Sequence, residues 1–385
     1  MVTAKILNKN HARQRGLPTL LSGLIAGMLL TFTALAQAAD DGEPLHGFLD
    51  VGYSTHSRDA NNNPSLPRGF NVGSLDIYLT PQFDSNVKAL IELIFETPSE
   101  GGIATDLERA QIGYLFSDNA TVWAGRFHTP YGYWNNGFHH GSQFQTSVSR
   151  PRFLDFEDKG GILPAHMVGL WGTGKIGAGA GKFTYDVYAG NGPAIAVDPV
   201  AGTAELDIQT SGDNNHQAMV GMNLGYEFSG MADGLRLAVH ALNGDVEDNV
   251  APTFNVTELS MAGGSVVYLT NEWEVLGEYY RFSNKDKSGA TGTHTSWADY
   301  LQVGRNFDGL TPYLRAEKTV LSQLDNYFIF QDSGQSYDRQ ALGLKYDLNP
   351  KAALKFELQN SKFAAETGRT AYKYRSFLAQ YAIRF

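Results

Sequence analysis

The sequence predicts an all-β fold, a transmembrane antiparallel β-barrel of sixteen strands. Three observations support this prediction: an apolar leader with a small-residue cleavage pattern, segments in which apolar and polar residues alternate, and tight turns that alternate with long polar connections. Overall composition is less informative. A membrane barrel exposes only every second residue of each strand to lipid, so its average composition stays close to that of a globular protein.

Residues 1–38 are predicted to be a cleaved signal peptide. Residues 1–16 are basic, residues 17–35 are apolar, and Ala36-Gln37-Ala38 supplies the small-x-small cleavage pattern. An uncleaved membrane anchor is the alternative, because the apolar run is long for a signal peptide. Only helices and closed barrels satisfy their backbone groups in lipid. We therefore expect residues 39–385 to form one barrel domain in a Gram-negative outer membrane.

The strands are predicted from an apolar/polar alternation with a period of two residues. In residues 354–359, for example, Leu, Phe and Leu alternate with Lys, Glu and Gln. The predicted strands span residues 45–56, 70–83, 86–97, 104–117, 120–134, 166–174, 180–191, 216–229, 234–245, 255–269, 272–284, 295–307, 310–321, 336–348, 352–363 and 372–385. Segments 166–174 and 295–307 alternate least clearly, so fourteen or eighteen strands remain alternatives.

The connections between these segments fall into two classes. Those after even-numbered segments are mostly tight, such as Asp84-Ser85 and Asp308-Gly309, whereas those after odd-numbered segments are longer and polar. Short turns on one rim and long loops on the other are typical of outer-membrane barrels. A soluble propeller or repeat sandwich, the alternative architecture, gives no reason for this alternation.

Aromatic residues near the segment ends predict two interfacial girdles. They are Phe83, Phe116, Phe228, Tyr346 and Phe385 toward the short turns, and Phe95, Tyr131, Tyr279 and Phe282 toward the long loops. Both termini of the barrel are then expected on the short-turn, periplasmic rim.

Composition limits the function. The chain has no cysteine, which excludes disulfides, thiolate metal sites and a cysteine nucleophile. Four of the 30 basic residues lie in residues 1–38, so the rest of the chain carries 26 basic against 40 acidic residues, a net charge of −14. We therefore expect no nucleic-acid partner. No cofactor is predicted.

Short motifs resemble known families. Residues 377–385 end in a terminal Phe and resemble the signature by which the assembly machinery recognises Gram-negative barrel proteins. The layout after residue 38 resembles Gram-negative porins. Motifs that resemble the O/P-type (phosphate-selective) porins lie in residues 108–114, 124–132, 149–152 and 168–170. The resemblance implies a water-filled lumen for small hydrophilic solutes, a homotrimer in outer-membrane lipid, and anion selectivity from basic residues in the channel. The acidic balance of this chain departs from that last property.

The longest connection, residues 135–165, is the third outer loop of the predicted barrel. The resemblance to general porins implies that this loop folds inward and narrows the lumen. Charged side chains interact more strongly with ions there than in bulk water, because the local dielectric is lower. The predicted constriction residues are Lys88, Glu92, Arg109, Arg126 and His128 on strands, and Arg150, Arg152, Asp155, Glu157, Asp158 and Lys159 in the loop. Alternatively, the loop acids pair with Arg150 and Arg152 and only pin the loop to the wall.

Other functional classes find less support. His139-His140 with His128 is a candidate metal set, but adjacent strand histidines point to opposite sides, and we predict no metal site. His140 and Ser142 lack an acid placed behind the histidine, so we predict no enzyme. A structural or interaction barrel, either an adhesin or a sheath for a partner, is the main alternative to a channel. A plugged lumen would indicate it.

Overall fold

The computed structural model describes residues 45–57, 68–97, 102–138, 142–157, 161–197, 204–248, 255–329, 331 and 334–385. The predicted signal peptide, residues 1–38, lies outside these ranges. Within them, no helix combines the length and the apolar character needed to cross a membrane.

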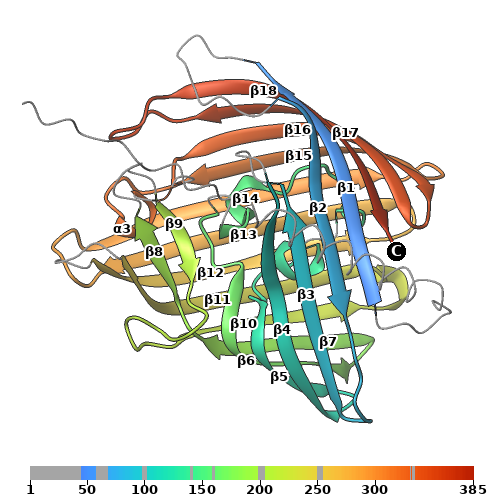
Figure 1. Cartoon of the computed structure of the whole chain (residues 1–385), viewed down its shortest axis with the longest axis horizontal. Coiled ribbons are helices and arrows are strands. Elements are labelled where there is room, and N and C mark those ends of the chain that lie inside the picture. Colours follow the sequence, from blue (N-terminus) through green and yellow to red (C-terminus); the bar gives the residue numbers. More distant parts are fainter. Residues whose placement is uncertain are drawn as a thin grey trace, which may run out of the picture. The chain divides into compact units, whose positions relative to one another are not determined.

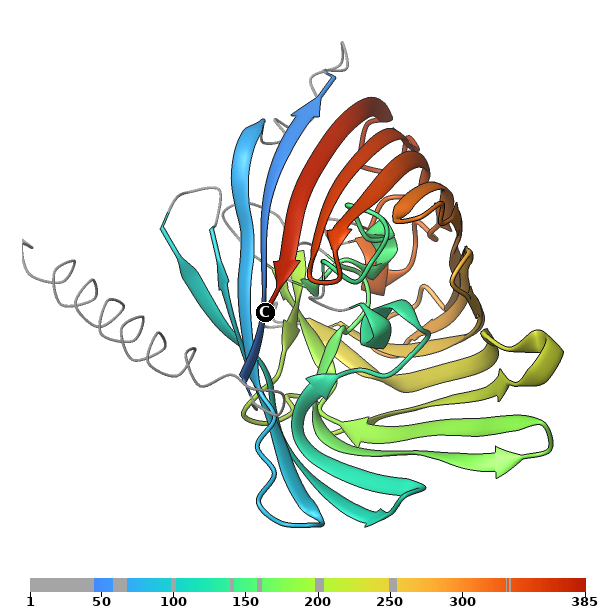
Figure 2. The same ribbon diagram turned by 90° about the vertical axis from the view of Figure 1, so that its right-hand side faces the viewer.

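Sixteen antiparallel strands of the described residues close into a barrel (Figures 1 and 2). The strands are β1 (Leu45–His56), β2 (Gly69–Leu79), β3 (Val87–Glu96), β4 (Ala104–Ser117), β5 (Ala120–His128), β6 (His166–Ala178), β7 (Gly181–Gly190), β10 (Met219–Phe228), β11 (Leu235–Asp248), β12 (Val256–Leu269), β13 (Trp273–Asp286), β14 (Thr293–Arg305), β15 (Leu310–Val320), β16 (Tyr337–Asn349), β17 (Ala352–Phe363) and β18 (Tyr372–Arg384). The predicted strand number is confirmed, since segments 166–174 and 295–307 both form strands.

Closure occurs between the first and the last strand. Val51 on β1 pairs with Tyr381 on β18, and the pairing continues to Phe48 and Arg384. Beyond it, the Gly47 N–H donates to the carbonyl of Phe385 over 3.1 Å, and the Phe385 N–H donates back over 3.0 Å. The start of β1 and the end of β18 therefore lie together on the rim that carries the short turns.

The two faces of the strands differ as the alternation predicts. On β17, Phe356 and Leu358 are 42% and 55% exposed, whereas Lys355 and Glu357 are buried. Because successive side chains of a strand point to opposite faces, the apolar row faces outward and the polar row inward. Two girdle predictions are wrong: Tyr131 and Phe282 are fully buried in an internal apolar cluster.

The alternation of turn lengths is also confirmed. The tight turn between β14 and β15 contains Asp308 and Gly309, with φ angles of 52° and 88°. Positive φ at two successive residues is typical of the hairpin turns whose twist matches that of the flanking strands. Asp and Gly are the residues that adopt it most readily.

Strand bounds differ from the prediction by a few residues, as where β2 ends at Leu79 and not at residue 83, and the largest departures occur at two places. β5 ends at His128 and not at residue 134, because Pro130 has no N–H to continue the ladder. A hairpin of two five-residue strands, β8 (Pro193–Val197) and β9 (Ala204–Ile208), lies in the connection between β7 and β10 and was not predicted. The first strand of the hairpin runs parallel to the end of β11. Runs this short carry too few alternating positions to be recognised.

Short helical turns occur only in the connections of the described residues. They are α2 (Trp134–Gly137), the 3₁₀ turn η1 (Arg152–Leu154), the 3₁₀ turn η3 (Gly230–Ala232) and α3 (Asn326–Ile329).

Candidate functional site

The described residues of the segment between β5 and β6, namely 129–138, 142–157 and 161–165, contact the inner side chains of distant strands. At its start, the N–H groups of Tyr133 and Trp134 donate to the Glu278 carboxylate on β13, each over 2.8 Å. The first N–H groups of a helix lack partners within it, so a carboxylate is a suitable acceptor where α2 begins. The Tyr280 and Tyr300 hydroxyls donate to the same carboxylate over 2.7 and 2.8 Å. The buried Glu278 carboxylate therefore accepts hydrogen bonds both from the wall and from the segment.

The middle of the segment is held by β15 and β17. The Val148 N–H donates to Glu357 Oε2 over 3.1 Å, and the Ser149 hydroxyl donates to Glu357 Oε1 over 2.5 Å. The Arg315 guanidinium donates to the Ser149 carbonyl over 2.8 Å. On β17 the Lys355 ammonium donates to the Ser147 carbonyl over 3.2 Å. Wall charges thus pair with backbone groups of the segment, which would otherwise be buried without partners.

The next turn of the segment, η1, is held in the same way. The Arg152 N–H donates to Glu317 on β15 over 2.9 Å, and the Phe153 N–H donates to the Tyr337 hydroxyl on β16 over 3.0 Å. The Phe153 ring packs edge-on against Tyr280 at a centroid distance of 5.3 Å. Apolar packing and hydrogen bonds therefore fix the segment against β13 and β15–β17.

A large cavity lies on the other side of the segment. Its volume is about 1320 Å³, and residues of β1, β2 and β18 line it together with residues of the segment. Its charged lining residues are the acids Asp50, Glu96, Asp155 and Glu205 and the bases Arg68 and Arg150. Residues of the segment and of β1, β2 and β18 therefore share a space whose lining carries charges of both signs.

The predicted strand residues of the site lie in two places. Arg109 forms an ion pair with Glu92, and His128 Nε2 lies 3.6 Å from the same carboxylate. Arg126 forms an ion pair with Asp106 over 3.1 Å. Lys88 lies apart from this cluster.

The Lys88 ammonium lies 4.9 Å from the centre of the Trp123 ring. Lys88 and Glu92 are four positions apart, which is roughly 13 Å along a strand. Lys88 therefore belongs to a different level of the inner face from the Glu92 cluster.

The predicted loop residues are also divided. The Arg150 guanidinium stacks on the Phe156 ring at 3.8 Å, and both Arg150 and Asp155 line the large cavity. Burial lowers the pKa of Arg150 below its usual range, and the Asp155 carboxylate opposes that shift. Arg152 lies over the Phe363 ring at 5.1 Å. Predicted residues Asp158 and Lys159 lie outside the described residues.

Glu157 faces the strands on which the segment begins and ends. Its Oε2 accepts a hydrogen bond from His166 Nδ1 over 3.0 Å. The structure therefore brings Glu157 toward β4–β6, whereas Asp155 lies on the cavity.

Sequence alternation overlooked one inner acid, Glu108. Glu92 on β3 pairs with Arg109 and Leu93 pairs with Leu107, so Glu108 is an extra residue in β4, a β-bulge. Strict alternation would place neighbouring residues on opposite faces, but the bulge brings Glu108, which is buried, to the inner face beside Arg109. No local sequence signal marks this bulge.

The wall acids Glu278, Glu317 and Glu357 were also absent from the predicted site. Their inward direction follows from alternation, and Glu357 belongs to a clear alternating row. Alternation does not indicate which residues these acids contact, because their hydrogen bonds with residues 129–165 join residues more than a hundred positions apart.

Comparisons with known proteins extend the description of the fold. No family model matches the chain, and no curated protein matches its sequence. An anion-selective porin from Comamonas acidovorans superimposes with a TM-score of 0.57 and 15% identity, covering 89% of this chain and 98% of the porin.

Two further solved structures give a similar result. The outer membrane channel DcaP of Acinetobacter baumannii has a TM-score of 0.54 and 12% identity, covering 89% of this chain and 96% of DcaP. Salmonella typhi OmpF, in complex with daunomycin, has a TM-score of 0.53 and 12% identity, covering 90% of this chain and 99% of OmpF. The chain therefore shares the closed antiparallel barrel fold of outer-membrane porins.

Proposed function

We propose that this chain is a porin of a Gram-negative outer membrane, which allows passive diffusion of small hydrophilic solutes and ions and catalyses no reaction. The observation that carries this proposal is the cavity of about 1320 Å³, lined by charges of both signs between residues 129–165 and strands β1, β2 and β18. The charged side chains of this lining can contact hydrated ions and polar solutes.

The outer face supports a membrane location. On β11, Leu237 and Val239 are exposed, whereas Ala238 between them and His240 after them are buried. The same pattern on β7 and β17 leaves apolar side chains on the face that water would cover in a soluble protein. An apolar band facing lipid explains these exposed rows.

We further propose that residues 135–165 form the constriction. Hydrogen bonds from Ser149 and Arg152 to Glu357 and Glu317 hold this segment against β15 and β17, and those to Glu278 hold the residues just before it. A solute would then pass along β1, β2 and β18, where Asp155 and Arg150 of the segment face the space. The charges at this place determine which ions enter.

Cation preference is the selectivity that the cavity supports. Its lining carries four acids against two arginines. The arginines of the motifs that resemble O/P-type porins have acidic neighbours, since Arg109 pairs with Glu92 and Arg126 with Asp106. We therefore propose a porin whose motifs resemble the O/P type but whose channel prefers cations.

A planar-bilayer recording under a salt gradient tests the proposal. Purified protein should insert in discrete conductance steps, and the reversal potential should shift to the side that indicates cation flow. A heat-modifiable, folded barrel that inserts but conducts no ions would contradict the porin and favour an interaction barrel. We also expect a homotrimer, which detergent-corrected light scattering would measure.

A further inference from the structure

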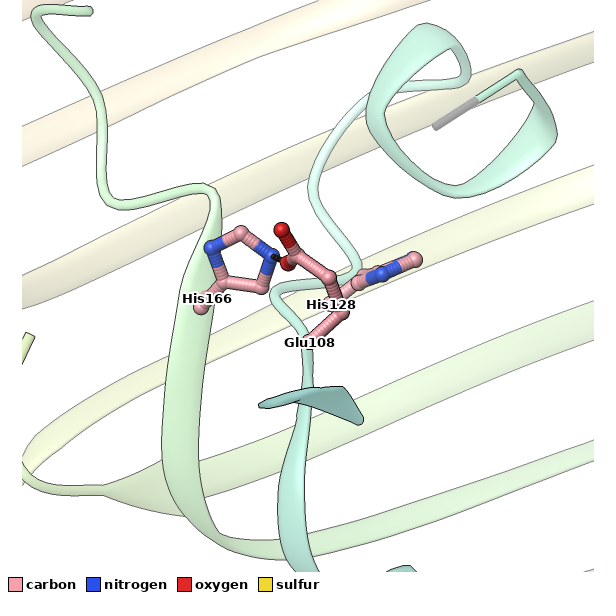
Figure 3. Close-up of side chains that lie close together, drawn as sticks. All are labelled: Glu108, His128 and His166. Carbon is pink, nitrogen blue, oxygen red and sulfur yellow. Dashed lines mark ion pairs between the residues drawn. The ribbon is translucent and has the colours of Figure 1, made fainter. Parts of the chain in front are cut away.

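Glu108, His128 and His166 form a row across three adjacent strands. His128 on β5 and His166 on β6 are direct partners in the sheet. On the other side of β5, β4 pairs with it as far as Ala110 and Arg126, and the bulged Glu108 of β4 contacts His166. Figure 3 shows the three side chains together, with the ion pair between Glu108 and His166 drawn as a dashed line.

We propose that this row binds a divalent transition-metal ion of the Zn²⁺ class. One ligand atom of each residue lies within 4.8 Å of the others, and all three residues are buried. Two imidazoles and one carboxylate form a donor set that suits Zn²⁺, Co²⁺ and Fe²⁺ better than Ca²⁺ or Mg²⁺, which prefer oxygen ligands.

Glu157 fixes the orientation of one ligand. Its Oε2 accepts from His166 Nδ1 over 3.0 Å, and its Oε1 accepts from the His166 backbone N–H over 2.9 Å. A carboxylate on Nδ1 directs Nε2 toward the ion, which is the usual outer-shell arrangement for a metal-binding histidine. His166 Nε2 indeed points at the Glu108 carboxylate, 2.5 Å from Oε2.

The local charge also favours a cation. Glu92, Glu108 and Glu157 surround the two histidines, whereas Arg109 and Arg126 supply two positive charges. Asp106 also pairs with Arg126, so the acids of these ion pairs outnumber the arginines. A divalent ion would replace the direct contact of Glu108 with His166 by two metal–ligand bonds of about 2.0–2.2 Å.

A purely structural ion pair is the competing explanation, in which a protonated His166 bridges Glu108 and Glu157. That explanation predicts a stable fold without metal and no saturable uptake. The metal site predicts both uptake of one ion per chain and a dependence on His128, which the ion-pair explanation does not require.

The test uses the full protein folded in detergent, freed of metal with EDTA and then dialysed. Co²⁺ is titrated and followed by its visible d–d absorption, and Zn²⁺ is titrated by calorimetry. We expect one ion per chain, loss of binding in His128→Gln and Glu108→Gln, and binding about 10-fold to 100-fold weaker in Glu157→Gln. Each variant is first shown to be folded by its heat-modifiable gel shift.

His240→Gln is the matched control. His240 is also a buried, inward-facing histidine, but it lies on β11 with its ring 4.5 Å from that of Tyr280. This variant should bind as the unaltered protein does, and so should the double variant His139→Gln/His140→Gln. No saturable binding to the folded, unaltered protein would overturn the proposal. Binding that survives His128→Gln but is lost in the double variant would also overturn it.

Discussion

The Ser149 hydroxyl donates a 2.5 Å hydrogen bond to Glu357 Oε1, which joins two residues 208 positions apart in the chain. The other carboxylate oxygen accepts from the Val148 N–H over 3.1 Å and from the Tyr313 hydroxyl. Glu357 is fully buried on β17, and the Arg315 guanidinium lies 3.7 Å from it. This one charge therefore connects the segment between β5 and β6 to the wall.

Glu357→Gln should loosen that segment. The amide keeps the size of the side chain but removes the charge that strengthens the hydrogen bonds from Val148 and Ser149. Weakening a buried, charge-assisted contact of this kind costs about 1–3 kcal/mol. We expect faster amide hydrogen exchange in residues 146–153 and noisier open-channel current.

Glu227→Gln is the control for this change. Glu227 forms an ion pair with Lys175 over 2.9 Å, but Lys175 is exposed and Glu227 is partly exposed, so the pair contributes little. Amide exchange in residues 146–153 should therefore be unaltered in Glu227→Gln. If it is also unaltered in Glu357→Gln, the other wall contacts are sufficient to hold the segment.

Val187→Arg should impair assembly, whereas Thr184→Arg on the same strand should be tolerated. Val187 is 49% exposed on the outer face of β7, and an arginine facing lipid costs about 2–4 kcal/mol at the midplane. Thr184 faces a separate inner cavity of about 620 Å³, whose lining includes Asp186 and Glu227. The folded fraction on heat-modifiable gels measures both variants, and equal fractions would argue against the assigned faces.

Asp155→Asn combined with Glu205→Gln should move the reversal potential toward anions. Both acids line the large cavity. Two unit charges about 4 Å apart interact by roughly 4 kcal/mol at an effective dielectric of about 20, against about 1 kcal/mol in water, so cavity charges should dominate. The shift should shrink from about 0.1 M to about 1 M salt, as the screening length falls from about 10 Å to about 3 Å.

Asp338→Asn is the control for selectivity. Asp338 is exposed and lies 3.8 Å from Lys318. A reversal potential that moves as far in this variant as in the cavity variant would remove Asp155 and Glu205 from the selectivity site.

The turn between β15 and β16 should loosen as pH rises. Burial raises the pKa of Asp325 to about 6, although hydrogen bonds from the Tyr327 N–H and Asn284 oppose that shift. A raised pKa in the folded state means that the stabilising contribution of the protonated acid is complete below about pH 4 and is lost as the pH passes about 6. The shift corresponds to about 3 kcal/mol at most.

Hydrogen exchange of residues 326–329 at pH 5 and pH 8, corrected for the intrinsic exchange rate, measures this effect. Opening should be more frequent at pH 8. Asp325→Asn should remove the difference, and a persistent difference in that variant would assign it to another group.

Phe385→Ser should slow assembly without changing export. The backbone of Phe385 pairs with Gly47 at the closing seam, and its side chain ends an alternating apolar row that resembles the signature read by the assembly machinery. Pulse-chase labelling would measure the time course of the heat-modifiable form, with the periplasmic amount as the measure of export. An unaltered time course would argue against a role for this residue in assembly.

The sequence predicts the barrel well because alternation is a local property. Each strand shows its inner and outer rows within about ten residues, as residues 354–359 do. The contacts of the site are not local. Ser149 meets Glu357 only because the barrel closes, and no feature near either residue indicates the other.

The sequence fails to predict the inward direction of Glu108 for a different reason. Alternation assumes that every residue advances the ladder by one position, and a bulge breaks that assumption without a distinctive residue type. The row of Glu108, His128 and His166 is therefore visible only once the register of β4, β5 and β6 is known.

Because Phe48 on the first strand pairs with Arg384 on the last, the barrel closes only when nearly the whole chain is available. A chain that has not reached β18, or has lost it, presents two unpaired strand edges, and such edges pair readily with other chains. Contacts between distant parts of a sequence also make folding slow. We therefore expect this protein to depend on factors that keep its unfolded chains apart before the barrel closes. Loss of the last strand should cause aggregation rather than a smaller barrel.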